Sequence, residues 1–237
     1  MLYMKEKTNQ YEKLDPDLKV ERLLTTIKKD LRLTELPYHM ECFDNSNIQG
    51  AFPVSACVVF KNGKPSKRDY RHFNIKTVEG PNDFASMYEA LTRRYKRLME
   101  ENQTLPHLIV IDGGKGQLSS SVQALKDLGI YGKIAIVGIA KRLEEIYYPG
   151  DSLPLYIDKK SESLKVIQHM RDEAHRFGIT HHRNRRSKGT IVSKLTEIKG
   201  IGQETAAELL RVFKSVQRIK KTPVEDIAKV VGPSKAS

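Results

Sequence analysis

The 237-residue sequence contains little cysteine, no long apolar segment and fewer acidic than basic side chains. Its two cysteines, Cys42 and Cys57, lie in separate apolar runs and form no Cys-x-x-Cys pair, which argues against a zinc ribbon or a disulfide framework. The longest apolar run, 134–140, is too short to cross a bilayer, and the N-terminus lacks the apolar region of a signal peptide. We therefore expect a cytoplasmic protein that has no membrane partner.

The deficit of acidic residues leaves a formal net charge of +12, from 41 Lys and Arg against 29 Asp and Glu. Such a bias favours nucleic acid as the partner. The excess is concentrated near the C-terminus, where only Glu197, Glu204 and Glu208 oppose a series of lysines and arginines between residues 181 and 221. The C-terminal part is therefore the expected carrier of the positive field.

The spacing of apolar residues predicts a mixed α/β domain. A hairpin signal at Asn62-Gly63 and three closely spaced apolar runs predict an antiparallel meander. Helices and strands then alternate, which is the order of an RNase H-like fold, with a mixed sheet flanked by helices. The expected strands are 39–44, 54–60, 68–75, 107–112 and 133–139, the expected helices are 83–100, 117–128 and 161–177, and 146–157 is expected to form an extended hairpin or lid.

Three domains are predicted along the chain. Residues 1–37 form a helical connector or stub, 38–189 the RNase H-like domain, and 190–237 a small all-α domain. A linker-like break is expected after the segment 183–189.

Two predicted strands each end in an aspartate. Asp44 ends the first strand, and Asp112 ends the run Leu-Ile-Val-Ile, which is apolar on both faces and should be a central strand. The carboxyl ends of strands are where open α/β sheets place their chemistry, and two carboxylates there would hold a hard cation that acts on phosphate esters. His175, on a later helix, is a third candidate, as a metal ligand or as an acid or base. Each residue alone also has a structural interpretation, as a turn cap for the aspartates and a packed or surface side chain for the histidine.

Two further residues are candidates for a supporting role. Asp83 stands at the start of a predicted helix, where capping and function are equally consistent with its position. Lys115, in Gly113-Gly-Lys-Gly116, lacks the spacing of a phosphate-binding P-loop, although it could still neutralise a phosphate near the site.

The basic tail contains Gly200-Ile201-Gly202 directly before a predicted helix, which fits a helix-hairpin-helix motif that holds a phosphate backbone through its N–H groups. A capping box over Thr222–Glu225, with Pro223 at the first helical position, leads to a second hairpin at Gly232, and the sequence ends before the helix that should follow. The predicted DNA-binding residues are Lys199, Gly200, Ile201, Gly202, Arg183, Arg185 and Arg186.

Five segments together resemble UvrC, the family of nuclease subunits of bacterial nucleotide excision repair, from about residue 38 to the end. They are Glu-Cys-Phe-Asp44-Asn-Ser-Asn-Ile-Gln-Gly, Val-Glu-Gly-Pro-Asn-Asp83, Ile-Asp112-Gly-Gly-Lys-Gly-Gln-Leu, Gly138-Ile-Ala-Lys-Arg142 and Arg-Asp-Glu-Ala-His175-Arg-Phe. The resemblance implies an endonuclease that makes the incision on the 5′ side of a DNA lesion. It also implies that Asp44, Asp112 and His175 form a catalytic triad that binds Mg²⁺ or Mn²⁺, with Asp83 as a supporting acid.

The resemblance further implies that the tail is a tandem helix-hairpin-helix domain, and that the partners are damaged double-stranded DNA and UvrB, with UvrA upstream. The GIY-YIG nuclease and the UvrB-binding hairpin of full UvrC proteins are not visible, so we expect a C-terminal fragment. The leading hypothesis is metal-dependent hydrolysis of DNA. A non-catalytic DNA-binding or docking module, and an RNase H-like nuclease for branched DNA or RNA–DNA hybrids, stay open, as does the number of metal ions.

Overall fold

The computed structural model describes residues 15–46, 54–78, 80, 82–140, 145–198 and 200–236, without the side chains of 46 and 181–194. The chain divides into two compact units, Met1–Ile179 and Thr180–Ser237. The first unit contains the sheet and the second is helical. Within the described ranges, none of the helices combines the length and apolar character that a bilayer-spanning helix needs.

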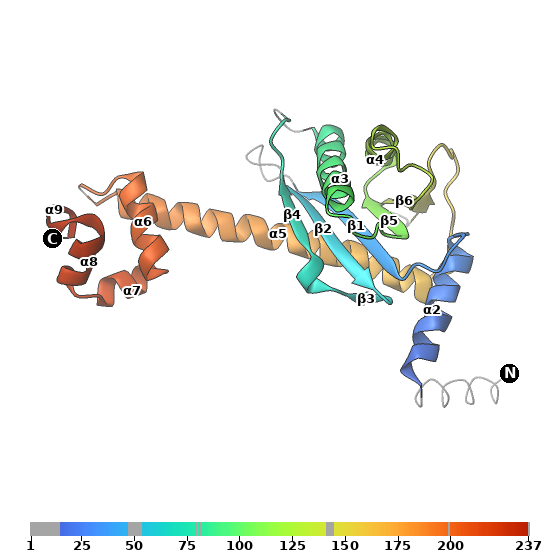
Figure 1. Cartoon of the computed structure of the whole chain (residues 1–237), viewed down its shortest axis with the longest axis horizontal. Helices are drawn as coiled ribbons and strands as arrows, with labels where there is room; N and C mark the ends of the chain where they lie inside the picture. The colour runs from blue at the N-terminus through green and yellow to red at the C-terminus, as the bar shows by residue number, and fades with distance from the viewer. Residues whose placement is uncertain are drawn as a thin grey trace. The chain divides into compact units, whose positions relative to one another are not determined.

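The first unit is built on a mixed sheet, in agreement with the predicted fold class (Figure 1). Its strand order is β3-β2-β1-β5-β6-β7, and β4 also pairs with β2. The central strands β1, β5 and β6 are parallel, and the remaining pairs are antiparallel. The strands are β1 (His39–Ser46), β2 (Val54–Lys61), β3 (Lys64–Pro65), β4 (Arg71–Asn74), β5 (Leu108–Asp112), β6 (Ala135–Ala140) and β7 (Glu145–Tyr147).

The predicted meander is present, with its third strand in two pieces. Asn62 and Gly63 have φ values of 54° and 74°, as a tight hairpin turn between β2 and β3 requires. The expected strand 68–75 begins only at Arg71, because residues Lys67–Asp69 form a short 3₁₀ helix that separates it from β3. The strand resumes as β4 beside β2.

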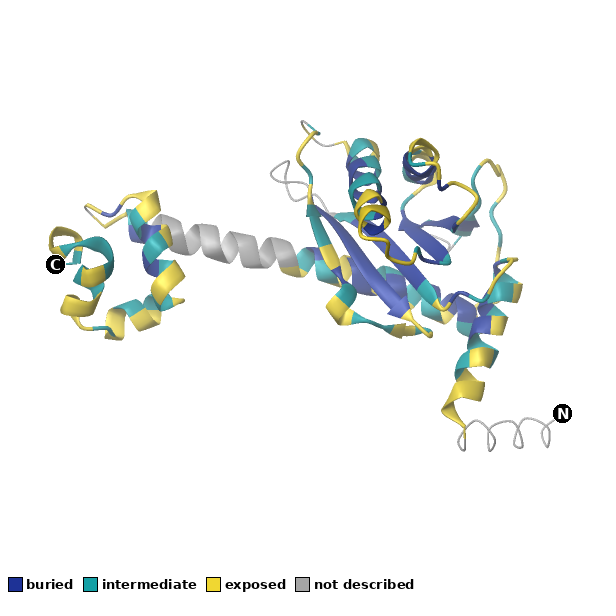
Figure 2. Cartoon of the chain, in the orientation of Figure 1, coloured by how far each residue is buried: buried dark blue, intermediate teal, exposed yellow. Residues whose placement is uncertain are grey.

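Helices cover both faces of the sheet. The helices α3 (Asp83–Glu100) and α4 (Lys115–Asp127) lie together on one face, and the first part of α5 (Glu162–Thr196) crosses the other (Figure 1). The central strands between these layers are buried (Figure 2). Side chains from α3, α4, α5 and the strands belong to one hydrophobic core.

Helix α2 (Pro16–Asp30) packs into that same core. Asp15 caps the helix by accepting a hydrogen bond from the N–H of Asp17, with Pro16 at the first position. Leu24, Ile27 and Leu31 are buried against the sheet unit. The prediction of a connector over 1–37 does not include this packing; Leu23 is partly buried against the core, whereas Leu18, nearer the start of the helix, stays exposed.

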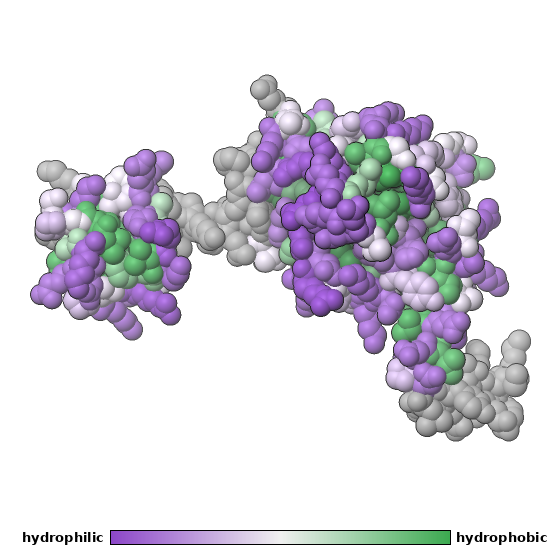
Figure 3. Space-filling model, viewed as in Figure 1, coloured by the Kyte–Doolittle hydropathy of each residue, from purple (hydrophilic) through white to green (hydrophobic). Residues whose placement is uncertain are grey.

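The second unit is a set of short helices around a small core. After α5 come α6 (Gln203–Phe213), α7 (Val216–Lys221), α8 (Val224–Val231) and α9 (Pro233–Ala236). Hydrophobic side chains gather between α6 and α8, with hydrophilic ones around them (Figure 3). The linker-like break expected after 183–189 is wrong as local structure, because the backbone of α5 is helical to Thr196.

The predicted capping box at the start of α8 is also wrong. Helix α8 begins at Val224 with Pro223 as its N-cap residue, so the proline precedes the first helical position. The hydroxyl of Thr222 donates to the carbonyl of Arg218, 2.7 Å away, and therefore belongs to the end of α7. The expected turn after α8 is present, since Gly232 has a φ of 85°. The expectation that the sequence ends before a following helix is wrong, because the short helix α9 follows the turn.

Candidate active site

Asp44 and Asp112 lie directly opposite each other on neighbouring parallel strands. They are partners in the register of β1 and β5, and each ends or nearly ends its strand. Paired residues of adjacent strands point to the same face, and adjacent strands are about 4.8 Å apart, so the two carboxylates are neighbours. Asp44 is 2% exposed and Asp112 is 3% exposed. The structure thus brings together the two aspartates singled out in the sequence.

His175 completes this group from α5. Its Nδ1 lies 3.0 Å from Oδ2 of Asp44, and its side chain is 51% exposed. The helix is fixed there because Met170 and Ala174 are buried in the core. The two carboxylates therefore point to the α5 side of the sheet, with a half-exposed imidazole on one of them.

The carboxylates of Asp44 and Asp112 create a negative potential around the carboxyl ends of β1 and β5. Burial raises the pKa of the Cys42 thiol, and the charges of Asp112 and Asp44 raise it further. Cys42 shares the strand face of Asp44, two residues earlier on β1. The carboxylates of Asp44 and Asp112 are adjacent and almost fully buried. Such a pair favours a bound cation, because the cation offsets both the repulsion between the two charges and their loss of hydration.

The donor set fits a hard divalent cation in its chemistry. Carboxylate oxygens are the ligands that Mg²⁺ and Mn²⁺ prefer, and Asp44 and Asp112 supply them from rigid strands. Within the part of the chain that the structure describes, no three His, Cys, Asp or Glu side chains are grouped so as to hold a metal ion. Nδ1 of His175 is in hydrogen-bond contact with Asp44. A three-ligand set of Asp44, Asp112 and His175 therefore stays a prediction.

Asp83 is brought to the same edge through a residue that the sequence reasoning missed. Asn45, next to Asp44, donates from Nδ2 to the backbone carbonyl of Asp83 at 2.7 Å, and its own side-chain oxygen accepts from the hydroxyl of Ser55. Asp83 does not cap α3, since Asn82 accepts the N–H of Ala85 at 3.0 Å. The adjacency of Asn45 to Asp44 was the only signal in the sequence.

Removal of the Asn45 side chain is expected to weaken this link. Asn45→Ala deletes the contact between β1 and the start of α3 and should lower the free energy of unfolding by about 1 kcal/mol. Urea unfolding measures this loss. Asp15→Ala, which removes the N-cap of α2 far from this edge, is the control with a similar expected cost of about 1 kcal/mol. DNA cutting should fall in Asn45→Ala and stay unchanged in the control; equal cutting by both would contradict a link to the site.

Lys115 is held by the hairpin that follows β6. Its Nζ donates to the carbonyl of Ser152 at 2.7 Å and lies 4.9 Å from the ring centroid of Tyr147. The bridge between Ile146 and Leu155 confirms that this excursion is a hairpin. The structure therefore gives Lys115 a partner in the hairpin, and its action on a phosphate stays a prediction.

The predicted DNA-binding residues of the tail are only partly described. Gly200 has a φ of 91°, Gly202 is the N-cap of α6, and the side of each backbone where a Cβ would stand is open. Ile201 is buried with Leu195 in the small core, so its side chain is structural. Lys199 lies outside the described residues, as do the side chains of Arg183, Arg185 and Arg186.

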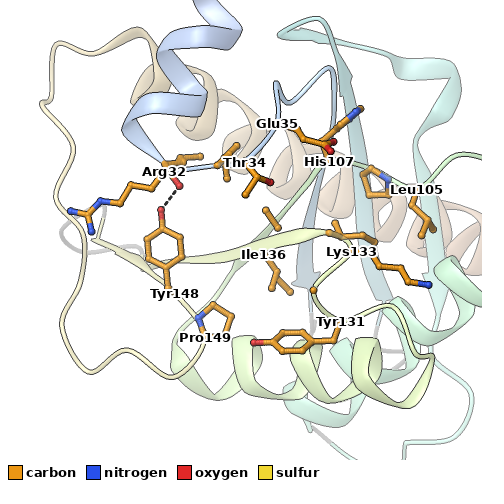
Figure 4. Close-up of a pocket in the computed structure, with 16 residues that line it drawn as sticks. Arg32, Thr34, Glu35, Leu105, His107, Tyr131, Lys133, Ile136, Tyr148 and Pro149 are labelled. Atoms are coloured by element: carbon orange, nitrogen blue, oxygen red, sulfur yellow. Dashed lines mark hydrogen bonds between the residues drawn. The ribbon is translucent and has the colours of Figure 1, made fainter.

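A cavity of about 670 Å³ lies at the opposite end of the central strands (Figure 4). His107 and Ala135, which line it, stand at the amino ends of β5 and β6. The hydroxyl of Tyr148 closes one side by donating to the carbonyl of Leu31 at 2.5 Å. Its position excludes this cavity as the place where the two aspartates would act.

The chain is similar to known proteins over nearly its whole length. A family model described as the UvrC RNAse H endonuclease domain matches residues 28–179. The UvrABC system protein C of Flavobacterium johnsoniae is 62% identical over 234 residues, which cover 99% of this chain and 39% of that protein. The same-named protein of Bacteroides thetaiotaomicron is 48% identical over 238 residues, which cover 99% and 39%. The chain thus spans about 39% of the length of these curated relatives.

Solved structures are more distant. A crystal structure of human ENDOV has a TM-score of 0.39 and 12% identity, and the match covers 70% of this chain and 98% of that one. A Ciona intestinalis endonuclease V, in complex with a 24mer DNA containing an inosine followed by a ribo-adenosine, has a TM-score of 0.34 and 17% identity, with 71% and 69% covered. These two likenesses are too weak to support a conclusion on function.

Proposed function

The chain belongs to the UvrC RNAse H endonuclease domain family, as its motifs predict, and we propose that this domain makes a metal-dependent incision on the 5′ side of a lesion during nucleotide excision repair. The observation that carries the proposal is the in-register pair of Asp44 and Asp112, with His175 on Asp44. Family membership supports the nuclease class, and the side of the incision comes from the resemblance alone.

Each residue of the group has a distinct part in the proposed reaction. Asp44 and Asp112 would hold Mg²⁺ or Mn²⁺ through their carboxylate oxygens. Such an ion, when bound, stabilises charge on the phosphate and lowers the pKa of a water. His175 orients Asp44 through Nδ1, and its half-exposed ring is open to exchange a proton with an oxygen of the ester or of water.

The proposed substrate is damaged double-stranded DNA, and the proposed partners are UvrB and, upstream, UvrA, in the cytoplasm. The names of the relatives, each a UvrABC system protein C, support these partners. The net charge of +12 supports the substrate. Within the chain we propose 38–189 as the nuclease domain and 190–237 as a helix-hairpin-helix domain. In the helix-hairpin-helix domain, the backbone N–H groups at Gly200 and Gly202, where no neighbouring atom stands at the Cβ position, would face phosphates. Lys199, Arg183, Arg185 and Arg186 are the side chains proposed to bind DNA with them.

Metal-dependent incision is tested with a 5′-labelled duplex that carries one lesion. The chain, joined to the N-terminal part found in its longer relatives, is mixed with UvrA, UvrB and Mg²⁺, and the product lengths are measured. We expect a cut on the 5′ side that is lost in EDTA and restored by Mg²⁺ or Mn²⁺. A cut on the 5′ side that persists without divalent ions would contradict the metal dependence. Salt-sensitive binding without any cut on that side would favour the docking module.

A further inference from the structure

We propose that Phe84 stacks on a base of the DNA strand that is cut, at a nucleotide flanking the scissile phosphate. Phe84 is the second residue of α3, and 54% of this large apolar side chain is exposed. The proposal rests on the proposed nuclease function and adds a substrate contact to it.

The ring is seated on the backbone of Gly116. A Cβ built at Gly116 would lie 2.5 Å from Cε1 and 2.8 Å from Cζ of Phe84, closer than real Cβ contacts allow. Only glycine leaves this space, so the ring lies against the first turn of α4. Contact on one side restricts the ring while its other side stays open to solvent. An exposed aromatic that is held in this way can receive a flat group at low entropic cost.

Two short connections along the chain place the ring of Phe84 near the two carboxylates, one through Gly116 and one through Asp83. Asp112 ends β5, and a short turn leads to α4, which begins at Lys115 and contains Gly116 in its first turn. Phe84 follows Asp83, whose carbonyl accepts the hydrogen bond from Asn45, next to Asp44. The ring therefore lies at the same edge of the sheet as the aspartates. It is on the α3–α4 side, whereas the carboxylates point to the α5 side.

This placement determines which part of the substrate the ring can meet. A phosphate at the carboxylates lies on the α5 side, so the ring is placed for a neighbouring nucleotide and not for the scissile phosphate. Base stacking on an aromatic tolerates any sequence, because every base has a π-face. That suits an enzyme which cuts at a position set by a lesion and not by a base sequence. If the ring only packed α3 against α4, its replacement by leucine would change stability but would leave KM for DNA unchanged.

The test compares Phe84→Leu, Phe84→Tyr and Gly116→Ala with the wild type, each in the joined protein described above. Leucine keeps the apolar contact and loses the π-face, tyrosine keeps both, and the alanine displaces the ring from its seat. Tyr131→Leu is the matched control, because Tyr131 is another exposed aromatic and borders the cavity at the far end of the strands. Urea unfolding midpoints confirm that each variant is folded.

Two signals are read on lesion duplexes that carry 2-aminopurine at successive positions around the incision. We expect Phe84→Leu and Gly116→Ala to raise KM on the order of tenfold with little change in kcat, as the loss of one stacked base predicts. In Ca²⁺ we expect the wild type to quench 2-aminopurine fluorescence at one flanking position, and we expect this quenching to disappear in both variants. Phe84→Tyr and Tyr131→Leu should retain wild-type KM and quenching.

The outcomes separate this inference from the proposed function. Wild-type KM and quenching in Phe84→Leu, with Asp112→Asn inactive, would overturn the stacking role and leave the nuclease site intact. Cutting by Asp112→Asn at the wild-type rate would overturn the nuclease site itself. Loss of activity in Phe84→Tyr together with Phe84→Leu would also contradict stacking, because the tyrosine ring offers the same face.

Discussion

Asp112→Asn is expected to reduce the proposed incision on the 5′ side by about a thousandfold, because it removes one of the two charges proposed to hold the ion that stabilises the developing charge on the phosphate. DNA binding should change little, since the carboxylate is 3% exposed. Incision is measured under single-turnover conditions on the labelled lesion duplex. Asp127→Asn, at the far end of the same helix that follows Asp112, makes the same change in charge and should cut normally.

The same variant has a second expected effect that needs no substrate. Without metal, Asp112→Asn should unfold at a higher urea concentration than the wild type, because it removes a like charge beside Asp44. Addition of Mn²⁺ should stabilise the wild type and not the variant, since the proposed site needs both carboxylates to bind the ion. Unfolding midpoints with and without Mn²⁺ measure both effects. Equal stabilisation of the two proteins by Mn²⁺ would place the ion elsewhere, whatever happens to cutting.

Glu41→Gln is expected to lower the free energy of unfolding at pH 7 by about 3 kcal/mol. Glu41 is fully buried on β1, where Arg94 donates to it at 2.6 Å and the hydroxyl of Tyr95 at 3.0 Å, and His39 lies 3.1 Å away. Burial alone would raise the pKa of Glu41, but the hydrogen bonds and charges of His39 and Arg94 lower it from 4.5 to about 2. Glutamine leaves the buried guanidinium of Arg94 without its counter-charge.

The lowered pKa also sets a pH dependence. The unfolded state binds a proton near pH 4.5 and the folded state only near pH 2, so the stabilisation from Glu41 is complete above pH 4.5 and is lost as the pH falls toward 2. Urea unfolding between pH 7 and pH 2.5 should show this slope, and Glu41→Gln should show less of it. Glu162→Gln removes a partly exposed ion pair with Arg22 and should cost at most about 1 kcal/mol. A similar cost for both variants would contradict a special role for the buried pair.

Local patterns were sufficient to predict the elements that place the candidate site. The apolar run before Asp112 requires a central strand, and the alternation along β1 correctly assigns Asp44 and Glu41 to opposite faces. Helix α3 begins and ends where its periodicity predicts. These features depend on neighbours within a few residues, and a sequence displays such neighbours directly.

Contacts between distant residues were not predictable in the same way. The partner of Glu41 is Arg94 on α3, and nothing near either residue in the chain points to the other. The seat of Phe84 depends on the absence of a side chain at Gly116, which in the sequence looks like ordinary turn chemistry. Thr222 was assigned to the wrong helix because a threonine can serve the end of one helix as well as the start of the next.

If the proposed site is correct, the register of β1 and β5 makes cutting activity a measure of completed folding. Side chains alternate along a strand, so a slip of one residue between these strands would turn one aspartate away from the other while leaving a compact, helix-covered sheet. The two strands are parallel and lie far apart in the chain, so their pairing is among the contacts that are slowest to form. A refolded preparation can therefore regain its secondary structure and still contain molecules that do not cut. The fraction of molecules able to cut would therefore measure the fraction in which β1 and β5 are paired in the correct register.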